Sequence, residues 1–579
     1  MINISINNAK TSVPEGTTIL EAARSLGVHI PTLCHLDLHD IKMVNKVGTC
    51  RVCMVEIEGR RNLMPACSTN VTEGMNIHTS TKRAVTARRT NVELLLSNHP
   101  RECLVCERNL NCELQSLAAL LGIREIRYKG ERMHSERDHS SYSIVRNAEK
   151  CVLCRRCETM CDDVQSVGVY SCVKRGFGTV MGTAFNMPMI ETSCTFCGQC
   201  VSVCPTGALT ETDDTAEVWK AINDPDKYVI VQTAPAIRVA LGELFGMPVG
   251  SQVTGKMVTA LKRMGFNRVL DTDFAADLTV MEEATEFLAR LNKGGPLPIL
   301  TSCCPAWVKF IEHQFPELLD IPSTCKSPHE MFGAVAKTYL ANKIDVDPNK
   351  IVVVSIMPCL AKKFEAKREE LGTTKDGSDV DYVISTRELA RMIHEAGINF
   401  PELPDGDFDS VMGESTGASV IFGTSGGVIE AVVRTVAAWL DEKAPVNVNF
   451  TQLRGMEGIR EAEVIVGGKK VSIAIAHGLG NARQLLSDIR DGKAKYDAIE
   501  IMACPSGCVG GGGQPYHNNN IEVLRKRAAA IFKEDEEKTV RMSHENEEIK
   551  RLYSEFLGER NGEKAHELLH THYQKRDRI

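Results

Sequence analysis

Cysteine spacing constrains this chain more than any other feature of its sequence. The 579 residues include 22 cysteines, and 16 of these lie before residue 210. The opening MINISINNAK lacks the basic and then apolar order of an export signal, so we expect a cytoplasmic protein whose thiols stay reduced. Metal ligation or redox chemistry therefore explains the cysteines better than disulfides do, and the first third is predicted to consist of metal-binding modules.

Composition excludes several other protein classes. The net charge of −7 gives no electrostatic reason to expect a nucleic-acid partner. No apolar run approaches the ~20 residues that span a bilayer, so no transmembrane segment is expected. With 43% hydrophobic and 25% charged residues, the composition is that of soluble globular protein, and the length implies several domains.

The strongest motif is a pair of cysteine runs with the spacing of bacterial ferredoxins. Each run has the form C-x2-C-x2-C-x3-C, and the second is followed by Pro205. In ferredoxins, two such runs hold two 4Fe-4S clusters, and the fourth cysteine of each run crosses to the other cluster. Two zinc sites are the alternative, which the triple spacing and the trailing proline disfavour. The predicted ligands are Cys151, Cys154, Cys157 and Cys204 for the first cluster, and Cys161, Cys194, Cys197 and Cys200 for the second.

Two further cysteine motifs precede these runs. The four thiols of the first suit a 2Fe-2S cluster on the loops of a β-rich domain, although its first gap exceeds the plant-type spacing. The second could hold zinc or a 4Fe-4S cluster, and spacing alone does not decide. Its position between iron–sulfur modules favours a redox cluster, with the histidine tuning its potential. The motifs are Cys34-x15-Cys50-x2-Cys53-x13-Cys67 and His99-x3-Cys103-x2-Cys106-x5-Cys112.

After about residue 225 the pattern changes to buried strands alternating with amphipathic helices, which predicts an α/β body with parallel sheets. Three strands run straight into cysteines, in TSCC, MPC and MAC. Because α/β folds place ligand sites at the carboxyl ends of parallel strands, these motifs could converge and hold one further cubane. Adjacent Cys303 and Cys304 diverge in direction, so one of them is free for other work.

One predicted helix carries a row of ionisable side chains. Glu283, Glu286 and Arg290 share a helix face and could relay protons. An exposed ion pair between Glu286 and Arg290 is the ordinary alternative.

The ordered motifs TSCCPAW (301–307), MPCLAKKFE (357–365) and MACPSGCVGGGGQ (502–514), behind the N-terminal cysteine modules, resemble the iron-only (FeFe) hydrogenases of the long, clostridial type. The resemblance covers essentially the whole chain and implies a multidomain α+β and α/β fold. The implied domains are a β-grasp 2Fe-2S domain at 1–80, a 4Fe-4S domain with one histidine and three cysteine ligands at 81–135, a ferredoxin-like domain with two 4Fe-4S clusters at 140–215, an H-cluster catalytic domain at 216–535 and a helical segment like the family's small subunit at 536–579.

The resemblance also implies cofactors and site residues. These are one 2Fe-2S cluster, three 4Fe-4S clusters of which one has a histidine ligand, and an H-cluster: a cubane joined by one cysteine to a two-iron subsite with CO, cyanide and an azadithiolate. The cubane ligands implied by the motifs are Cys304, Cys359, Cys504 and the bridging Cys508. The implied proton path is Cys303, Glu283, Ser323, Glu286 and Arg290. The implied subsite lining is Ala234, Pro235, Met357, Phe422, Met502 and Lys362, the last donating to a cyanide.

The implied activity is reversible H2 oxidation and proton reduction, with ferredoxin as the partner of a stand-alone enzyme. The tail HELLHTHYQKR, and Ala236 where a serine often follows the AP pair, are more similar to catalytic subunits of NAD(P)-coupled, electron-bifurcating complexes. Such complexes carry flavin, nicotinamide and 2Fe-2S sites on partner subunits, and maturation enzymes load the two-iron subsite. A sensory hydrogenase and a complex-I-like electron-transfer subunit are the alternatives. His329, where glutamine often follows SP, is a second departure from the monomeric enzymes.

Some features stay outside this interpretation. His566 to His570 match the HExxH pattern of zinc proteases, but a surface helix explains them better. Gly478 and Gly480 resemble a nucleotide-binding turn whose third glycine is missing. Cys172 and Cys325 are expected to be buried small hydrophobes.

Overall fold

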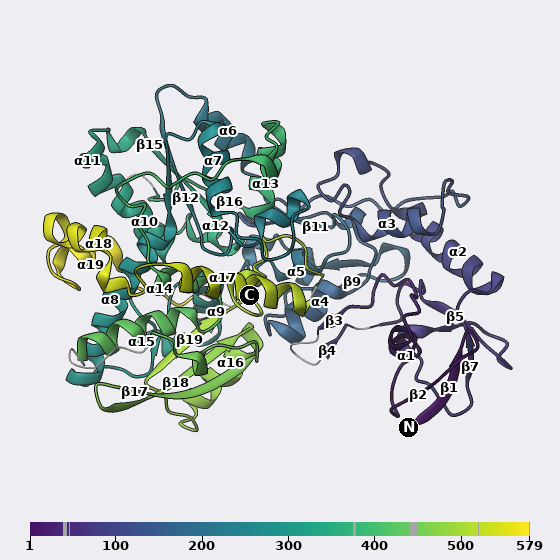
Figure 1. Cartoon of the computed structure of the whole chain (residues 1–579). Helices are drawn as coiled ribbons and strands as arrows, with labels where there is room; N and C mark the ends of the chain where they lie inside the picture. Colours follow the sequence, from purple (N-terminus) through teal and green to yellow (C-terminus); the bar gives the residue numbers. More distant parts are fainter. Residues whose placement is uncertain (39–42, 46, 374–377, 441–447, 519, 578–579) are drawn as a thin grey trace.

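The computed structural model describes residues 1–579 except 39–42, 46, 374–377, 441–447, 519 and 578–579. The N-terminal modules lie to one side of a larger body that contains the rest of the chain (Figure 1). Among the described residues, no helix is both long and apolar enough to cross a bilayer.

The first module is a small sheet with one packed helix. The alternation of apolar and polar residues at its start forms a strand and places Ile4 and Ile6 in the core. Its helix begins at Thr18, where the side chains of Thr18 and Glu21 form a capping box. The sheet order is β2-β1-β7-β5-β6. The elements are β1 (Ile2–Ile6), β2 (Ala9–Val13), α1 (Ile19–Ser25), β3 (Asp37–Leu38), β4 (Met43–Val44), β5 (Met54–Ile57), β6 (Met64–Pro65) and β7 (Asn76–His78).

The second and third modules contain short elements between cysteines. Helix α2 leads into the second module. Apolar residues around Cys34, Cys154 and partly buried Cys112 form one cluster that joins the three modules. The elements are α2 (Lys82–Asn98), α3 (Glu113–Leu120), β8 (Ile144–Arg146), α4 (Arg156–Thr159), β9 (Ser171–Val173), β10 (Val180–Gly182), α5 (Gln199–Val203) and β11 (Leu209–Glu211).

The body contains two sheets. The first has the order β13-β12-β15-β16, and its neighbours are all parallel, as predicted. In the second, of order β14-β19-β18-β17, β19 is parallel to both of its neighbours. The strands are β12 (Tyr228–Thr233), β13 (Arg268–Asp271), β14 (Ile299–Leu300), β15 (Ile351–Met357), β16 (Tyr382–Ser385), β17 (Ile459–Val466), β18 (Lys469–His477) and β19 (Ala498–Met502).

The prediction of parallel sheets was wrong at one edge, because β17 runs antiparallel to β18. Gly467 and Gly468 both have positive φ, 55° and 74°. Two such residues close a tight hairpin whose twist matches antiparallel strands. The second sheet is therefore mixed.

Helices cover these sheets and carry the chain between them. The long helix α8 packs against both α10 and α15. Helix α17 ends at Glu537, so the predicted domain boundary between residues 535 and 536 falls inside this helix. The helices are α6 (Thr215–Ile222), α7 (Thr254–Met264), α8 (Thr272–Lys293), α9 (Pro305–Gln314), α10 (Pro328–Val335), α11 (Ala341–Ile344), α12 (Ala361–Glu365), α13 (Thr386–Glu395), α14 (Gly417–Val420), α15 (Gly427–Leu440), α16 (Leu479–Arg490), α17 (Ile521–Glu537), α18 (Glu547–Leu552) and α19 (Glu563–Leu569).

Candidate metal centres

Three strand ends bring distant cysteines to one place in the body. Strands β14, β15 and β19 end just before the motifs that contain Cys304, Cys359 and Cys504. Burial raises the pKa of the Cys504 thiol, and the nearby thiols of Cys359, Cys304 and Cys508 raise it further. The backbone N–H of Ala503 donates to Cys304 Sγ at 3.5 Å. The structure therefore brings the four predicted cubane ligands together. Their binding of iron stays a prediction.

The chemistry of these four thiols fits an iron–sulfur cluster. Burial raises the pKa of Cys508 to about 12, and the pKa of Cys304 and Cys359 rises for the same reason. Thiolates are the form that ligates iron, so iron must compensate the charge that the apolar surroundings disfavour. A set of four convergent thiols suits a cubane.

The glycine run after Cys508 packs against the ferredoxin-like module. A Cβ on Gly512 would lie 2.7 Å from Gly198 Cα, and one on Gly511 would lie 2.2 Å from the Pro358 carbonyl oxygen. These positions therefore exclude any larger residue. They place the 502–514 motif directly beside the run that starts at Cys194.

The two ferredoxin-like runs exchange their last cysteines in space. One cavity is lined by three cysteines of the first run together with Cys204, and another by three of the second run together with Cys161. These are the groups of four that a crossed arrangement requires. The lining cysteines are Cys151, Cys154, Cys157 and Cys204 in the first cavity, and Cys161, Cys194, Cys197 and Cys200 in the second.

The cysteines of the first module are also close together. Cys34 Sγ and Cys50 Sγ lie 3.4 Å apart. A contact with Cys67 lowers the pKa of Cys53 to about 7. All four thiols therefore form one group at the end of the small sheet.

The second module groups one imidazole with three thiols. His99, Cys103, Cys106 and Cys112 line one cavity. Burial lowers the pKa of His99 to about 4, which leaves the imidazole neutral, as a metal ligand must be. Its buried Nδ1 has no hydrogen-bond partner among the described residues. This neutral, buried nitrogen therefore fits the predicted role of a metal ligand.

Neighbouring metal-binding groups are connected by direct contacts. Asn45 Nδ2 donates to the carbonyl oxygens of Cys34 at 2.6 Å and Cys154 at 3.0 Å. Lys150, next to the first ferredoxin-like run, donates to Cys106 Sγ at 3.4 Å. At the other end, Gln199 Nε2 donates to the Gly510 carbonyl oxygen at 2.9 Å. Both N-terminal groups thus contact the first ferredoxin-like run, and the second run contacts the body.

The predicted proton carriers lie along α8 and the loop after β14. Burial raises the pKa of Glu283 to about 8, and the charge of Glu286 raises it further. Burial also raises the pKa of Cys303, with the Glu283 charge as the next cause. Ser323 Oγ donates to Glu286 Oε2 at 3.0 Å. Ser323 therefore contacts both Glu283 and Glu286, and Glu283 lies near enough to Cys303 to influence its pKa, which is the order that the relay requires.

Arg290 ends this row in an ion pair that is not on the open surface. Its Nη2 donates to Glu286 Oε1 at 2.5 Å, and the side chains of Arg290 and Glu286 are only 10% and 12% exposed. The ion pair considered from the sequence therefore forms, but it is not exposed. The loop at Ile321 and Pro322 covers the guanidinium and accepts hydrogen bonds from it.

Lys362 is held by a residue that sequence reasoning missed. Lys362 Nζ donates to Glu365 Oε2 at 2.7 Å and to the Cys303 carbonyl oxygen at 3.1 Å. His329 Nε2 lies 2.7 Å from the same Glu365 oxygen. Burial would raise the pKa of Glu365, but Lys362 and His329 hold it at about 2. The i, i+3 spacing of Lys362 and Glu365 was the available signal.

The remaining predicted lining residues are buried on two sides of the strand ends. Phe422 and Met502 pack in the apolar cluster that borders Cys303 and Cys508. Ala234 and Met357 pack in the larger cluster around the first sheet. Pro235 is buried beside Ala234.

The two unassigned cysteines, the glycine turn and the HExxH segment differ in how the structure explains them. Cys325 is buried as expected, but Cys172 is exposed, because it lies on β9 of a short hairpin with little cover. A Cβ on Gly480 would lie 2.6 Å from the Val164 carbonyl oxygen, so this glycine permits packing between modules. His566 is exposed, whereas His570 is buried.

Family comparisons agree with this arrangement. The family described as the iron only hydrogenase large subunit, C-terminal domain, matches residues 227–512, and the iron hydrogenase small subunit matches 521–576. A 2Fe-2S iron-sulfur cluster binding domain matches 1–82, the NADH-ubiquinone oxidoreductase-G iron-sulfur binding region matches 88–127, and a 4Fe-4S binding domain matches 187–210.

Individual relatives extend over the whole chain. The chain is 54% identical to the NADP-reducing hydrogenase subunit HndD of Solidesulfovibrio fructosivorans, over 100% of both chains. It is 38% identical to iron hydrogenase 1 of Clostridium pasteurianum, over 99% of this chain and 100% of that one. An apo structure of the [FeFe]-hydrogenase HydA1 from Chlamydomonas reinhardtii matches with a TM-score of 0.57 and 40% identity, over 63% of this chain and 99% of that one. The chain therefore belongs to the iron-only hydrogenases, oxidoreductases that act on hydrogen.

Proposed function

We propose that this hydrogenase is the catalytic subunit of a cytoplasmic, electron-bifurcating complex that exchanges electrons with NAD(P)H and ferredoxin. The 54% identity to a subunit of an NADP-reducing hydrogenase, over the full length of both chains, supports this proposal. Flavin, nicotinamide and further 2Fe-2S sites would belong to partner subunits. Maturation enzymes would load the two-iron subsite. A stand-alone ferredoxin enzyme is the second candidate, supported by the 38% identity to iron hydrogenase 1.

The cofactor assignment follows the groups of cysteines. We assign a 2Fe-2S cluster to the 1–80 domain, a cubane with a histidine ligand to 81–135, two cubanes to 140–215 and the H-cluster to 216–535, with 536–579 as the helical segment. When bound, the H-cluster supplies the iron at which protons and electrons are converted to H2 and back. Four thiolates hold its cubane, and the Lys362 ammonium and the buried apolar lining orient the subsite and exclude water.

The electron route follows the contacts between modules. The Asn45 side chain ties the segments of Cys34 and Cys154, and Gly512 packs directly on Gly198. Contacts of this kind keep successive redox groups close. Electrons from the partners would enter at the N-terminal modules and pass through the ferredoxin-like module to the body. Cys103 is exposed beside Leu104, which is 91% exposed, and this supports docking of a partner at the second module.

The proton route is separate and uses side chains of the body. Cys303 would pass protons to and from the subsite, and Glu283 would exchange them with Cys303. At neutral pH a carboxyl group with a pKa of about 8 holds its proton and can still release it. The Ser323 hydroxyl donates to Glu286, so it can pass its own proton to Glu286 while it accepts one from the Glu283 carboxyl, and the hydroxyl is left unchanged.

The observation that carries the proposal is the 54% identity to a subunit of an NADP-reducing hydrogenase over the full length of both chains, and the convergence of three strand-end cysteine motifs supports the catalytic centre. Anaerobic purification from the native host tests it, with infrared spectra for bound CO and cyanide and identification of the co-purifying subunits. Flavoprotein partners and NAD(P)-dependent H2 exchange are the expected result. A single active chain that reacts only with ferredoxin would favour the stand-alone enzyme. A complete H-cluster without H2 turnover would favour a sensor.

A further inference from the structure

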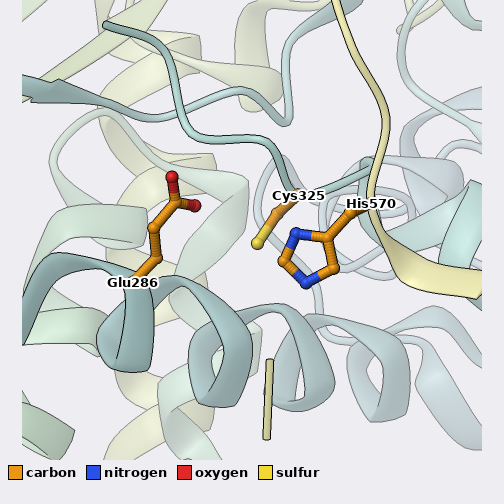
Figure 2. Close-up of side chains that lie close together, drawn as sticks. All are labelled: Glu286, Cys325 and His570. Atoms are coloured by element: carbon orange, nitrogen blue, oxygen red, sulfur yellow. The ribbon is translucent and has the colours of Figure 1, made fainter. Parts of the chain in front are cut away.

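The C-terminal HELLH segment lies against the proposed proton path. Figure 2 shows Glu286 of α8, Cys325 and His570 directed toward one small space. One ligand atom from each of these three residues lies within 4.8 Å of the others. The backbone fixes this approach, because Lys326 N donates to the Leu569 carbonyl oxygen and Thr571 N donates to that of Thr324, both at 2.8 Å. The tail thus forms part of the wall of the path.

We infer that His566 and His570 form a proton inlet that joins the relay at Glu286. The inference rests on the proposed relay through Glu283, Ser323 and Glu286. It assigns a role to the HELLH segment in place of the zinc chemistry that its pattern suggests.

A hydroxyl group connects the histidine to the relay. Thr324 Oγ1 lies 2.8 Å from His570 Nδ1 and 3.4 Å from Glu286 Oε2. A threonine hydroxyl can accept one proton while it donates another. When His570 releases a proton from Nδ1, the hydroxyl passes its own proton to Glu286, so the hydroxyl is unchanged and the carboxylate gains one proton.

The other nitrogen of His570 is held by a second carboxylate. His570 Nε2 lies 3.0 Å from Glu282 Oε2, and Glu282 also accepts hydrogen bonds from Tyr553 and from Asn561 N. Both nitrogens of His570 therefore have partners without a metal ion. An imidazole with partners at both nitrogens can take up a proton on one side and release it on the other.

His566 connects this buried histidine to solvent. The ring centroids of His566 and His570 lie 4.1 Å apart. His566 is exposed, and the charges of Glu282 and Glu286 act on its imidazole. His566 therefore lies between solvent and the buried pair of His570 and Glu282, where a proton taken up from water can enter.

Arg290 cannot itself serve as this inlet. The guanidinium of Arg290 occupies Glu286 Oε1, and a guanidinium does not lose its proton in a protein. Arg290 can therefore orient Glu286 but cannot carry protons from solvent to it. Histidine is the side chain whose ordinary pKa permits repeated loading and release near neutral pH.

Several ionisable side chains surround His570. The titratable groups around it are Glu282 and Glu286 from α8, His566 from α19, Tyr553 from the segment after α18, and Cys325 and Tyr573 from the adjoining loops.

The test compares holoenzyme variants. In His570→Gln the amide can keep hydrogen bonds but cannot carry protons at neutral pH. His572→Gln is the matched control, because His572 is an exposed histidine of the same tail. We expect His570→Gln to lower H2 evolution about threefold or more, which is less than the roughly 100-fold loss from removing a sole proton carrier. The pH profile of its rate should differ from that of the parent enzyme, while iron content and the CO and cyanide bands stay unchanged.

Two further readouts separate proton transfer from structural support. Added imidazole should restore the rate of His570→Ala. Infrared difference spectra between oxidised and reduced enzyme should show altered carboxyl bands in His570→Gln and normal ones in His572→Gln. An unchanged rate and pH profile in His570→Gln would overturn the inlet. So would a slow variant whose pH profile is normal and which imidazole does not restore.

Failure of the relay itself is distinguishable from failure of the inlet. If Glu286→Gln stays fully active, the proposed relay is wrong and the inlet falls with it. If Glu286→Gln is inactive while His570→Gln matches the control, only the inlet is wrong.

Discussion

Glu365 offers a direct test of how the body holds a buried ammonium group beside the predicted H-cluster site. One carboxylate oxygen of Glu365 contacts Lys362 Nζ at 2.7 Å, His329 Nε2 at 2.7 Å and Ser327 Oγ at 3.0 Å. Glu365 is 5% exposed, Lys362 8% and His329 1%. Glu365→Ala would leave the Lys362 charge buried without its partner.

The expected loss is large because none of these groups can turn to solvent. Breaking a buried ion pair by removing one partner costs about 3 to 5 kcal/mol. Glu365→Gln keeps an acceptor oxygen but loses the charge, so it should cost about 1.5 to 3 kcal/mol, the value of a hydrogen bond to a charged group. With a denaturant slope of about 3 kcal/mol per molar, the urea midpoint of Glu365→Ala should fall by about 1 to 2 M.

Anaerobic urea unfolding followed by tryptophan fluorescence measures this loss. The three tryptophans, Trp219, Trp307 and Trp439, all lie in the body. Glu369→Gln is the control, since Glu369 is exposed a few residues further along the chain. Midpoints of both Glu365 variants equal to that of Glu369→Gln would refute the claim that this carboxylate holds Lys362.

Three other predictions concern the proton carrier, the crossed cysteines and the contact between modules. Because the pKa of Glu283 is raised to about 8, its carboxyl holds a proton at neutral pH and loses it above about pH 8, where H2 evolution measured with a chemical reductant should fall. Glu283→Gln should lower this rate about 100-fold or more at every pH. Electron paramagnetic resonance of reduced Cys204→Ser should show loss of the cluster held by residues 151–157, and that of Cys161→Ser loss of the cluster held by 194–200; the opposite assignment would contradict the crossing. Asn45→Ala should leave two buried carbonyls unpaired, at about 1 to 3 kcal/mol each, and make the N-terminal modules more sensitive to proteolysis than the parent protein.

Local sequence patterns predicted much of the fold because they have local physical causes. Alternation at Ile2 to Ile6 and the capping box of Thr18 and Glu21 each act within one element, so such elements follow from their own residues. Strand β17 was missed, because two glycines and its pairing with β18, rather than its own composition, make it a strand.

At the candidate site, too, local patterns predicted some residues, and only the tertiary structure revealed the others. Cysteine spacing predicted the candidate metal-binding groups, because closely spaced thiols of one run can reach the same cluster. Contacts between distant segments had no such signal. Asn45 bridges two modules and His570 reaches Glu286 from the far end of the chain, and neither could be placed before the tertiary structure was known. Glu365 stood within a recognised motif, yet only its contact with His329 reveals its role.

The central claim is that thiolates from three distant strand ends hold one catalytic iron centre next to the ferredoxin-like module. Anomalous diffraction at the iron edge from anaerobically grown crystals of the native protein measures it most directly. We predict iron bonded to the sulfurs of Cys304, Cys359, Cys504 and Cys508, with further iron at the two crossed groups. Iron at the ferredoxin-like groups with none among these four sulfurs would contradict it.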